Sequence, residues 1–324
     1  LQTQFSADDY YPMAIVTPGD SNNVRAEPSP SGELLGQIPA GGGMQIYREA
    51  PVCLNGNLWR HIATPQLEGW TVEASADTYF IVPYQQPDPV VFKNPHDGSD
   101  WVVSLRGVTF TVPAALPFDQ ISAQPEPFSL FTMYMLTSSL SFTFDQPLVD
   151  NWGWPTNITV YDYGNAPDLL SDGDWLQTLL TEQPPLVETF REQRRPPQSP
   201  IVGRSMYTGI PTYVPFGDGN GLRYITFFAA EIISFDPAHS SMVYRGMTDD
   251  GAYLIAMDMP VQLPSGAIPP GDPSRVPDAN TINTFEDNLA ARPTSTFTPD
   301  LALYDALFNS IQITNESALD AALP

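Results

Sequence analysis

The stretch LRYITFFAAEIISFDPAHSSMVYRGMTDDGAYLIAMDMPVQLP, residues 222–264, decides the fold that the sequence predicts. Its first part, Leu222–Ile233, is largely apolar at both alternating positions, which is typical of a strand covered on both faces. Tyr244–Met247 and Tyr253–Val261 flank TDDG at 248–251, a turn whose glycine can take a positive φ. Because apolar residues alternate from Tyr253 onward, the stretch predicts a hairpin with one buried side.

Helices are predicted on both sides of this hairpin. Leu169, Leu176 and Leu180 share one helical face in a segment that stops at two prolines, and 186–195 continues as a second short helix. Near the end of the chain, Thr298 as N-cap and Pro299 at the first helical position predict an amphipathic closing helix over 297–313. We expect these helices to cover the sheet.

Further strands and boundaries complete the predicted larger domain. Aromatic and β-branched residues predict strands from Trp101, from Phe128 and over Asn157–Tyr163. The domain then spans 100–313 and includes a Pro/Gly-rich loop at 262–280. An extended segment (1–10), short strands (11–78) and a Pro-rich linker (79–99) precede it, and a tail (314–324) follows.

The short strands of the N-terminal region carry a resemblance. NVRAEPSPSGELLGQIPAG begins at Asn23, LWRHIA at Leu58 and EGWTVEA at Glu68, and together they resemble a bacterial SH3-type (SH3b) domain. The resemblance implies a small β-barrel with a binding groove, in which Arg25, Trp59 and Trp70 are the candidate contacts. The alternative is that both tryptophans pack in the core and rim. The inward positions are predicted to be Val24, Leu35, Ile38, Ile62 and Val72.

A second resemblance covers roughly residues 100–313. GDGNGLRYIT, YRGMTDDGAYLIA and FTPDLALYDALFNSI are similar to the C-terminal region of uncharacterised secreted proteins and lipoproteins of Chloroflexota-type bacteria. This resemblance implies an extracytoplasmic location and supplies no catalytic residues. The predicted fold class is therefore mainly β with α+β character: a small SH3-like β-barrel, then a larger α+β domain whose antiparallel sheet is covered by helices.

Charge and composition limit the partners. With 13 Lys and Arg against 37 Asp and Glu, the formal charge is −24, so the surface repels nucleic acid and anionic lipid headgroups. No run of 18 apolar residues predicts a transmembrane helix. The first residues do not show the basic segment followed by an apolar segment that is typical of a signal peptide. We therefore expect any signal peptide to precede the numbered chain.

No catalytic constellation emerges from the sequence. The single cysteine, Cys53, lies in the predicted barrel, and His61, His96 and His239 are scattered without metal-ligand spacing. A glycosidase needs two close carboxylates, which a chain this acidic always offers by chance. We therefore predict no catalytic residue and no cofactor.

Calcium is the one metal worth weighing, because Asp/Gly/Asn loops offer hard oxygen ligands. The candidate ligands are Asp172, Asp174 and Asp218, and the loop at 97–100 has similar composition. None of these loops matches EF-hand spacing, and Asp-Gly is also a common way to build a turn. The sequence favours turns over metal sites.

These observations predict a secreted, non-enzymatic envelope or extracellular-assembly protein that acts by protein or cell-wall contact. Its expected partners are an envelope or extracellular protein and peptidoglycan. One alternative is a cell-wall glycan or peptide hydrolase, which needs a cleft with converging carboxylates. Another is an accessory subunit of a larger extracellular complex or filament, which needs a large exposed apolar patch.

Overall fold

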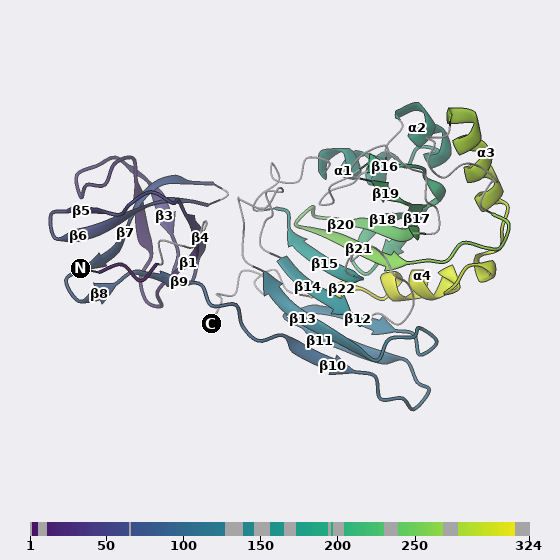
Figure 1. The fold of residues 1–324 in the computed structure, drawn as a ribbon, viewed down its shortest axis with the longest axis horizontal. Coiled ribbons are helices and arrows are strands. Elements are labelled where there is room, and N and C mark those ends of the chain that lie inside the picture. The colour runs from purple at the N-terminus through teal and green to yellow at the C-terminus, as the bar shows by residue number, and fades with distance from the viewer. Residues whose placement is uncertain are drawn as a thin grey trace. The chain divides into compact units, whose positions relative to one another are not determined.

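The computed structural model describes residues 2–5, 12–64, 66–126, 139–145, 156–164, 173–193, 196, 204–229, 239–267 and 278–314 (Figure 1). Its backbone contacts separate two compact units. The first lies mainly within Leu1–Asp88, and the second within Pro89–Gln124 and Leu140–Ala318. The span 79–99, predicted as a linker, contributes one strand to each unit's sheet, β9 and β10.

The first unit is a nine-stranded sheet. Seven strands follow the order β3-β2-β7-β6-β4-β1-β9, while β5 pairs with β6 and β8 with β7. The bounds are β1 (Met13–Val16), β2 (Asn22–Arg25), β3 (Leu34–Ile38), β4 (Gly43–Ile46), β5 (Val52–Leu54), β6 (Asn57–Ala63), β7 (Glu68–Ser75), β8 (Thr78–Tyr79) and β9 (Ile81–Pro83). Among the described strands β3 and β9 end the path without pairing with each other, so the sheet of the predicted small SH3-like barrel is not closed, while the mainly β class is confirmed.

The core of the first unit follows the predicted alternation only in part. Val24, Ile38 and Ile62 are buried as predicted, but Leu35 is 42% exposed. In β7 the buried residues are Gly69, Thr71, Glu73 and Ala74, whereas Val72 is only half-buried. At Gly69 a Cβ atom would lie 2.6 Å from the Arg25 carbonyl oxygen, so this close approach requires glycine.

The second unit is built on an eight-stranded sheet, ordered β10-β13-β14-β15-β21-β20-β18-β17. The bounds are β10 (Val90–Lys93), β13 (Gln120–Glu126), β14 (Ser139–Phe144), β15 (Asn157–Asp162), β17 (Gly209–Phe216), β18 (Gly219–Thr226), β20 (Ser241–Thr248) and β21 (Tyr253–Pro260). The five strands from β15 to β17 pair antiparallel with their neighbours. The predicted strand at Asn157 is thereby confirmed.

The hairpin of β20 and β21 is confirmed, with Gly251 at φ 71° in its turn. Burial differs from the expectation of one buried side, because Leu254 and Ala256 are buried as well as Tyr253 and Ile255. Helices α1 and α4 pack on the sheet, which explains burial of both faces. The strand predicted from Leu222 continues only to Thr226, and residues 230–233 lie outside the described residues.

Two small sheets complete the strands. β11 (Trp101–Leu105), β12 (Val108–Val112) and β22 (Gln312–Ile313) form one, and β16 (Arg204–Ser205) pairs with β19 (Phe228–Ala229) in the other. Phe110 of β12 packs edge-on against Phe142 of β14, with ring centroids 5.0 Å apart. The single strand predicted from Trp101 is thus a hairpin that packs on the large sheet, and residues 128–138 of the next predicted strand lie outside the described residues.

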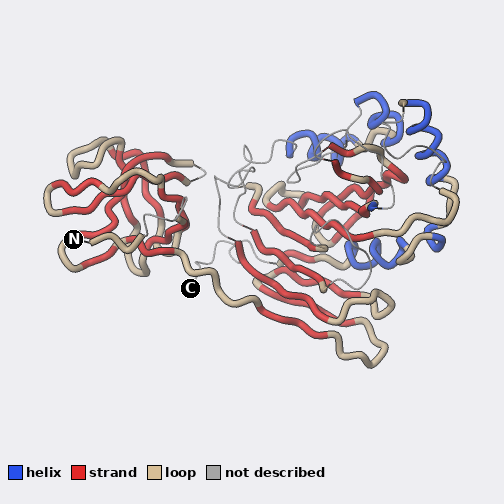
Figure 2. The backbone as a smooth tube through the Cα atoms, viewed as in Figure 1, coloured by secondary structure: helices blue, strands red, loops and turns tan. Residues whose placement is uncertain are grey.

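The described helices all belong to the second unit (Figure 2). α1 (Gly173–Glu182) and α2 (Leu186–Gln193) match two predicted helices, although Leu169 lies outside the described residues. α3 (Ala279–Ala290) was not predicted. The closing helix α4 is shorter than predicted, Leu301–Asn309, because Asp300 rather than Thr298 caps it and accepts a hydrogen bond from Ala302 N.

Candidate functional site

A row of side chains crosses one face of the first sheet. His61 on β6 is the register partner of Trp70 on β7, and Trp70 is in turn the partner of Arg25 on β2. Tyr47, which follows β4, donates its backbone N–H to the His61 carbonyl oxygen at 3.0 Å. Because directly paired residues project to the same face of a sheet, these four side chains form one line, here called the ring row.

Three members of the ring row are stacked. The Tyr47 and His61 ring centroids lie 4.5 Å apart at 24°, and those of His61 and Trp70 lie 5.0 Å apart at 18°. His61 sits between the other two rings and keeps 20% of its side chain exposed, while Tyr47 and Trp70 are half-buried. The inner ring faces are shared, so a ligand meets the ring edges and the outer faces of the two end rings.

Two exposed carboxylates flank the histidine. Glu49 Oε2 lies 3.5 Å from His61 Nδ1, and Glu68 Oε1 lies 3.7 Å from His61 Nε2. His61 Nδ1 is buried and makes no hydrogen bond within the described part of the chain. Acceptor oxygens beside the ring row attract ligand groups that donate hydrogen bonds or carry positive charge, such as hydroxyl and amino groups.

The structure separates the three residues that the sequence predicted as groove contacts. Trp70 and Arg25 are both in the ring row, and Arg25 Nη1 donates to the Gly32 carbonyl oxygen at 2.7 Å. Trp59 is only 2% exposed, so it cannot be a surface contact in this conformation. Its position agrees with the alternative prediction of core packing.

Sequence reasoning missed Tyr47 and His61. The available signal was the spacing of Trp59 and His61 on one strand, which places alternate residues on one face. Trp59 pairs with Val72 and His61 with Trp70 in one unbroken register, so this spacing is kept in the structure. Trp59 also pairs with Val52 of β5 and is buried, whereas His61 stays partly exposed. The cross-strand pairing that brings His61 to Trp70 is a long-range feature with no local sequence mark.

Comparison with known proteins adds no further assignment. No protein-family model, curated protein or solved structure matches this chain. None of the described helices is long and apolar enough to cross a membrane. The geometry of the ring row therefore carries the functional argument by itself.

The described calcium candidates, Asp174 and Asp218, belong to no group of metal-ligating side chains. Asp172 lies outside the described residues, Asp174 accepts a hydrogen bond from the Tyr163 hydroxyl at 3.3 Å, and Asp218 lies exposed in the turn before β18. The similar loop at 97–100 uses Asp97 Oδ1 to accept from Ser99 N at 2.9 Å, which is turn geometry. Across the described ranges no three His, Cys, Asp or Glu side chains are grouped to hold a metal ion.

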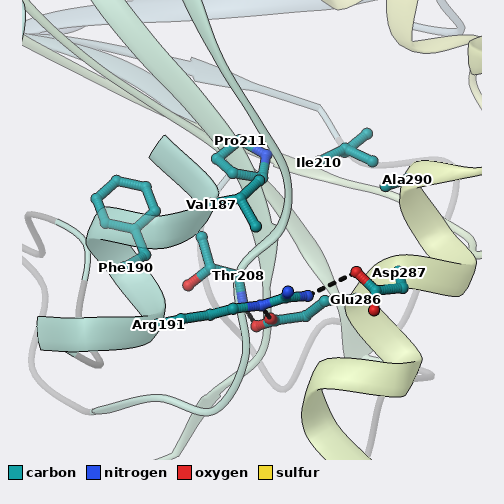
Figure 3. A pocket seen from close by; sticks show the side chains of 9 residues that line it. All are labelled: Val187, Phe190, Arg191, Thr208, Ile210, Pro211, Glu286, Asp287 and Ala290. Atoms are coloured by element: carbon teal, nitrogen blue, oxygen red, sulfur yellow. Dashed lines mark hydrogen bonds and ion pairs between the residues drawn. The ribbon is translucent and has the colours of Figure 1, made fainter. Parts of the chain in front are cut away.

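A small cavity in the second unit lies between α2, α3 and the start of β17 (Figure 3). Arg191 of α2 contacts Asp287 Oδ1 at 2.6 Å and Glu286 Oε2 at 3.5 Å, so it pairs with carboxylates of α3. Burial raises the pKa of Glu286, whose Oε1 accepts from Thr208 N. The cavity volume of about 20 Å³ has room for about one water molecule. The ion pairs of this site connect α2 to α3, and the cavity is too small for a ligand larger than water. Arg194 and Arg195 lie outside the described residues.

Other buried carboxylates of the second unit are also paired with arginine. Burial raises the pKa of Asp305, although Arg223 Nη1 lies 2.8 Å from Asp305 Oδ2 and the Tyr244 hydroxyl donates to Oδ1. Burial likewise raises the pKa of Asp258, whose Oδ1 lies 3.2 Å from Arg245 Nη2. In the described part of the chain, each carboxylate with a raised pKa therefore has an arginine beside it rather than a second carboxylate across a cleft.

Proposed function

We propose that this protein is a secreted, non-enzymatic envelope or extracellular-assembly protein whose contact surface is the ring row of the first unit. The observation that carries the proposal is the stack of Tyr47, His61 and Trp70, which remains partly exposed beside two carboxylates. Stacked rings have little conformational freedom to lose, so they present a large preformed contact area. The resemblance to a bacterial SH3-type domain supports the same unit as the binding module.

The chemistry of the row favours a ligand that carries hydroxyl or amino groups. Glu49 and Glu68 are 58% and 63% exposed, so each can still accept hydrogen bonds from a bound molecule. Cell-wall glycan offers hydroxyl groups, and an extracellular protein partner offers amino groups. The net charge of −24 opposes nucleic acid as the ligand.

The proposal is tested by pull-down with purified sacculi and with native envelope proteins. Wild type should bind at least one of the two, and Trp70→Ala should bind at least tenfold less, because the end ring of the row is gone. Leu54→Ala is the matched control, since Leu54 is an exposed apolar residue of the same sheet whose register partner, Asn57, is outside the row. Absence of wild-type binding to both preparations would contradict the proposal.

The same incubation examines the hydrolase alternative. Release of soluble wall fragments by wild-type protein would replace the non-enzymatic proposal with an enzymatic one. The paired state of Asp258, Glu286 and Asp305 favours no release, because each raised-pKa carboxylate is held by an arginine instead of facing a partner carboxylate. The accessory-subunit alternative predicts that the native protein elutes in a large complex.

A further inference from the structure

The N-terminal segment Gln2–Phe5 is bound by the first unit without joining its sheet. Thr3 Oγ1 donates to Glu73 Oε2 at 3.0 Å, and Gln4 N donates to Glu73 Oε1 at 2.8 Å. The Tyr79 hydroxyl donates to the Gln2 carbonyl oxygen at 2.7 Å. These contacts run from the segment to side chains of β7 and β8, so side chains rather than a strand ladder hold the segment.

A buried ion pair forms the floor of this site. Arg60 Nε donates to Glu73 Oε2 at 2.8 Å, and Glu73 is fully buried while the Arg60 side chain is 7% exposed. Arg60 Nη2 also donates to Thr3 Oγ1, so the segment hydroxyl bridges both members of the pair. A buried pair needs additional hydrogen bonds to offset its desolvation, and the segment provides them.

The first unit contacts every second side chain of the segment. Thr3 and Phe5 point inward, and Phe5 is 6% exposed in the core with its ring 5.4 Å from the Arg60 guanidinium carbon. Gln2 and Gln4 are exposed. Pockets for every second side chain are the way that proteins recognise extended peptides, so the pattern that this site reads is Thr-x-Phe.

Packing around the segment is incomplete on one side. A cavity of about 260 Å³ is bordered by Thr3, Phe5 and Arg60, and by residues 46–51 on its other wall. Departure of the segment would remove the hydrogen bonds that Thr3 and Gln4 make to the ion pair, and it would break no strand pairing, because the described segment belongs to no strand.

We propose that Arg60, Glu73 and Tyr79 form a peptide-binding site that the chain fills with its own residues 2–5. The ligand class is an extended peptide that carries threonine and, two residues later, phenylalanine. Arg60 and Glu73 lie on the opposite side of β6 and β7 from His61 and Trp70, although Tyr47 and Glu49 also line the cavity beside the segment. The peptide-binding site does not depend on the function proposed for the ring row.

The test uses the full chain with its own segment disabled by Thr3→Ala and Phe5→Ala. The probe is a fluorescent synthetic peptide, LQTQFS, which copies residues 1–6. Fluorescence polarisation should detect saturable binding to the double variant. Binding to wild type should be at least tenfold weaker, because the site is already occupied. A Gln4→Ala chain is the matched control and should behave as wild type, since the Gln4 side chain is exposed.

Peptide controls measure specificity. LQTQAS should bind the double variant at least tenfold more weakly than LQTQFS, whereas LQTAFS should bind equally well. Equal binding of LQTQFS and LQTQAS, or equal binding of LQTQFS to wild type and double variant, would overturn the proposal. If the double variant does not fold, Phe5→Leu replaces it, and LQTQFS must raise its melting temperature by more than LQTQAS does. No such difference would equally overturn the proposal.

Discussion

Both units stack aromatic rings, but they expose them differently. In the first unit His61 lies between Tyr47 and Trp70 and remains 20% exposed. In the second unit Tyr244 stacks on Phe308 of α4 with centroids 4.7 Å apart, and both rings are fully buried. Similar ring stacking therefore stabilises the core of the second unit, whereas in the first unit it leaves part of the stacked rings exposed to solvent. Exposure, rather than stacking, is what marks the ring row as a contact surface.

The largest effect should come from the buried stack. Phe308→Ala removes a core ring that fixes α4 on the sheet, and such substitutions cost about 3–5 kcal/mol. We predict a lower free energy of unfolding for the second unit, measured by denaturant titration. Binding through the ring row should not change, measured by sacculus pull-down. A loss of binding in folded Phe308→Ala protein would contradict the claim that binding depends on the first unit and not on the second.

Disrupting the exposed stack should weaken binding strongly and lower the free energy of unfolding only moderately. His61→Ala removes two ring contacts worth about 0.5–1.5 kcal/mol each, so the free energy of unfolding should fall by about 1–3 kcal/mol. Binding to the ligand of the row should fall at least tenfold, because Tyr47 and Trp70 lose their common support. Unchanged binding, measured with the same pull-down, would remove His61 from the site.

Neutralising the flanking carboxylates should affect binding more than stability. Glu49→Gln with Glu68→Gln removes charge from two side chains that are more than half exposed, so the free energy of unfolding should change by less than about 0.5 kcal/mol. Binding should weaken and become less dependent on salt concentration, measured at low and high ionic strength. Binding that keeps its full salt dependence would place the ligand's charged groups elsewhere.

The smallest predicted effect lies in the hairpin turn of the second unit. Hydrogen bonds from the Thr248 hydroxyl and from Ala252 N lower the pKa of Asp250 below its ordinary value of 3.8. A lowered pKa in the folded state adds stability above the ordinary value, and this stability is lost as the pH falls through the lowered value. Asp250→Asn should therefore be less stable than wild type at neutral pH. Denaturant titrations at several pH values should show the difference narrowing below pH 3.8; a difference that stays constant would contradict the assignment.

Local patterns predicted the parts of the fold that local chemistry controls. The hairpin at 241–260 was predicted because strand alternation and a turn glycine lie together in the sequence. Whether the predicted small barrel closes depends on pairing between β3 and β9, which no local residue decides, and in the structure these two strands do not pair. α3 was missed because only Phe285 and Leu289 of its twelve residues are buried, so its apolar stripe is weak.

The candidate site was only partly predictable for the same reason. Trp70 lies in a turn-and-strand motif that is visible in the sequence. Its neighbours in the row come from β6 and from the end of β4, and the strand pairing that places them beside Trp70 is not visible in the sequence. Trp59 was predicted either as a groove contact or as a packed residue, and the sequence alone does not reveal its pairing with Val52 of β5 or its burial. The N-terminal segment was predicted as extended, yet its contact with the buried Arg60–Glu73 pair joins residues about seventy positions apart.

The most direct test of the central claim is an indole ¹H–¹⁵N NMR titration of the folded protein with solubilised sacculus fragments. The chain has six tryptophans, of which Trp70 is half-buried in the ring row while Trp59 and Trp101 are buried. The indole signal of Trp70 should shift in proportion to bound ligand, and those of Trp59 and Trp101 should stay in place. Binding that leaves the Trp70 signal unmoved would contradict the assignment of the ring row as the contact surface.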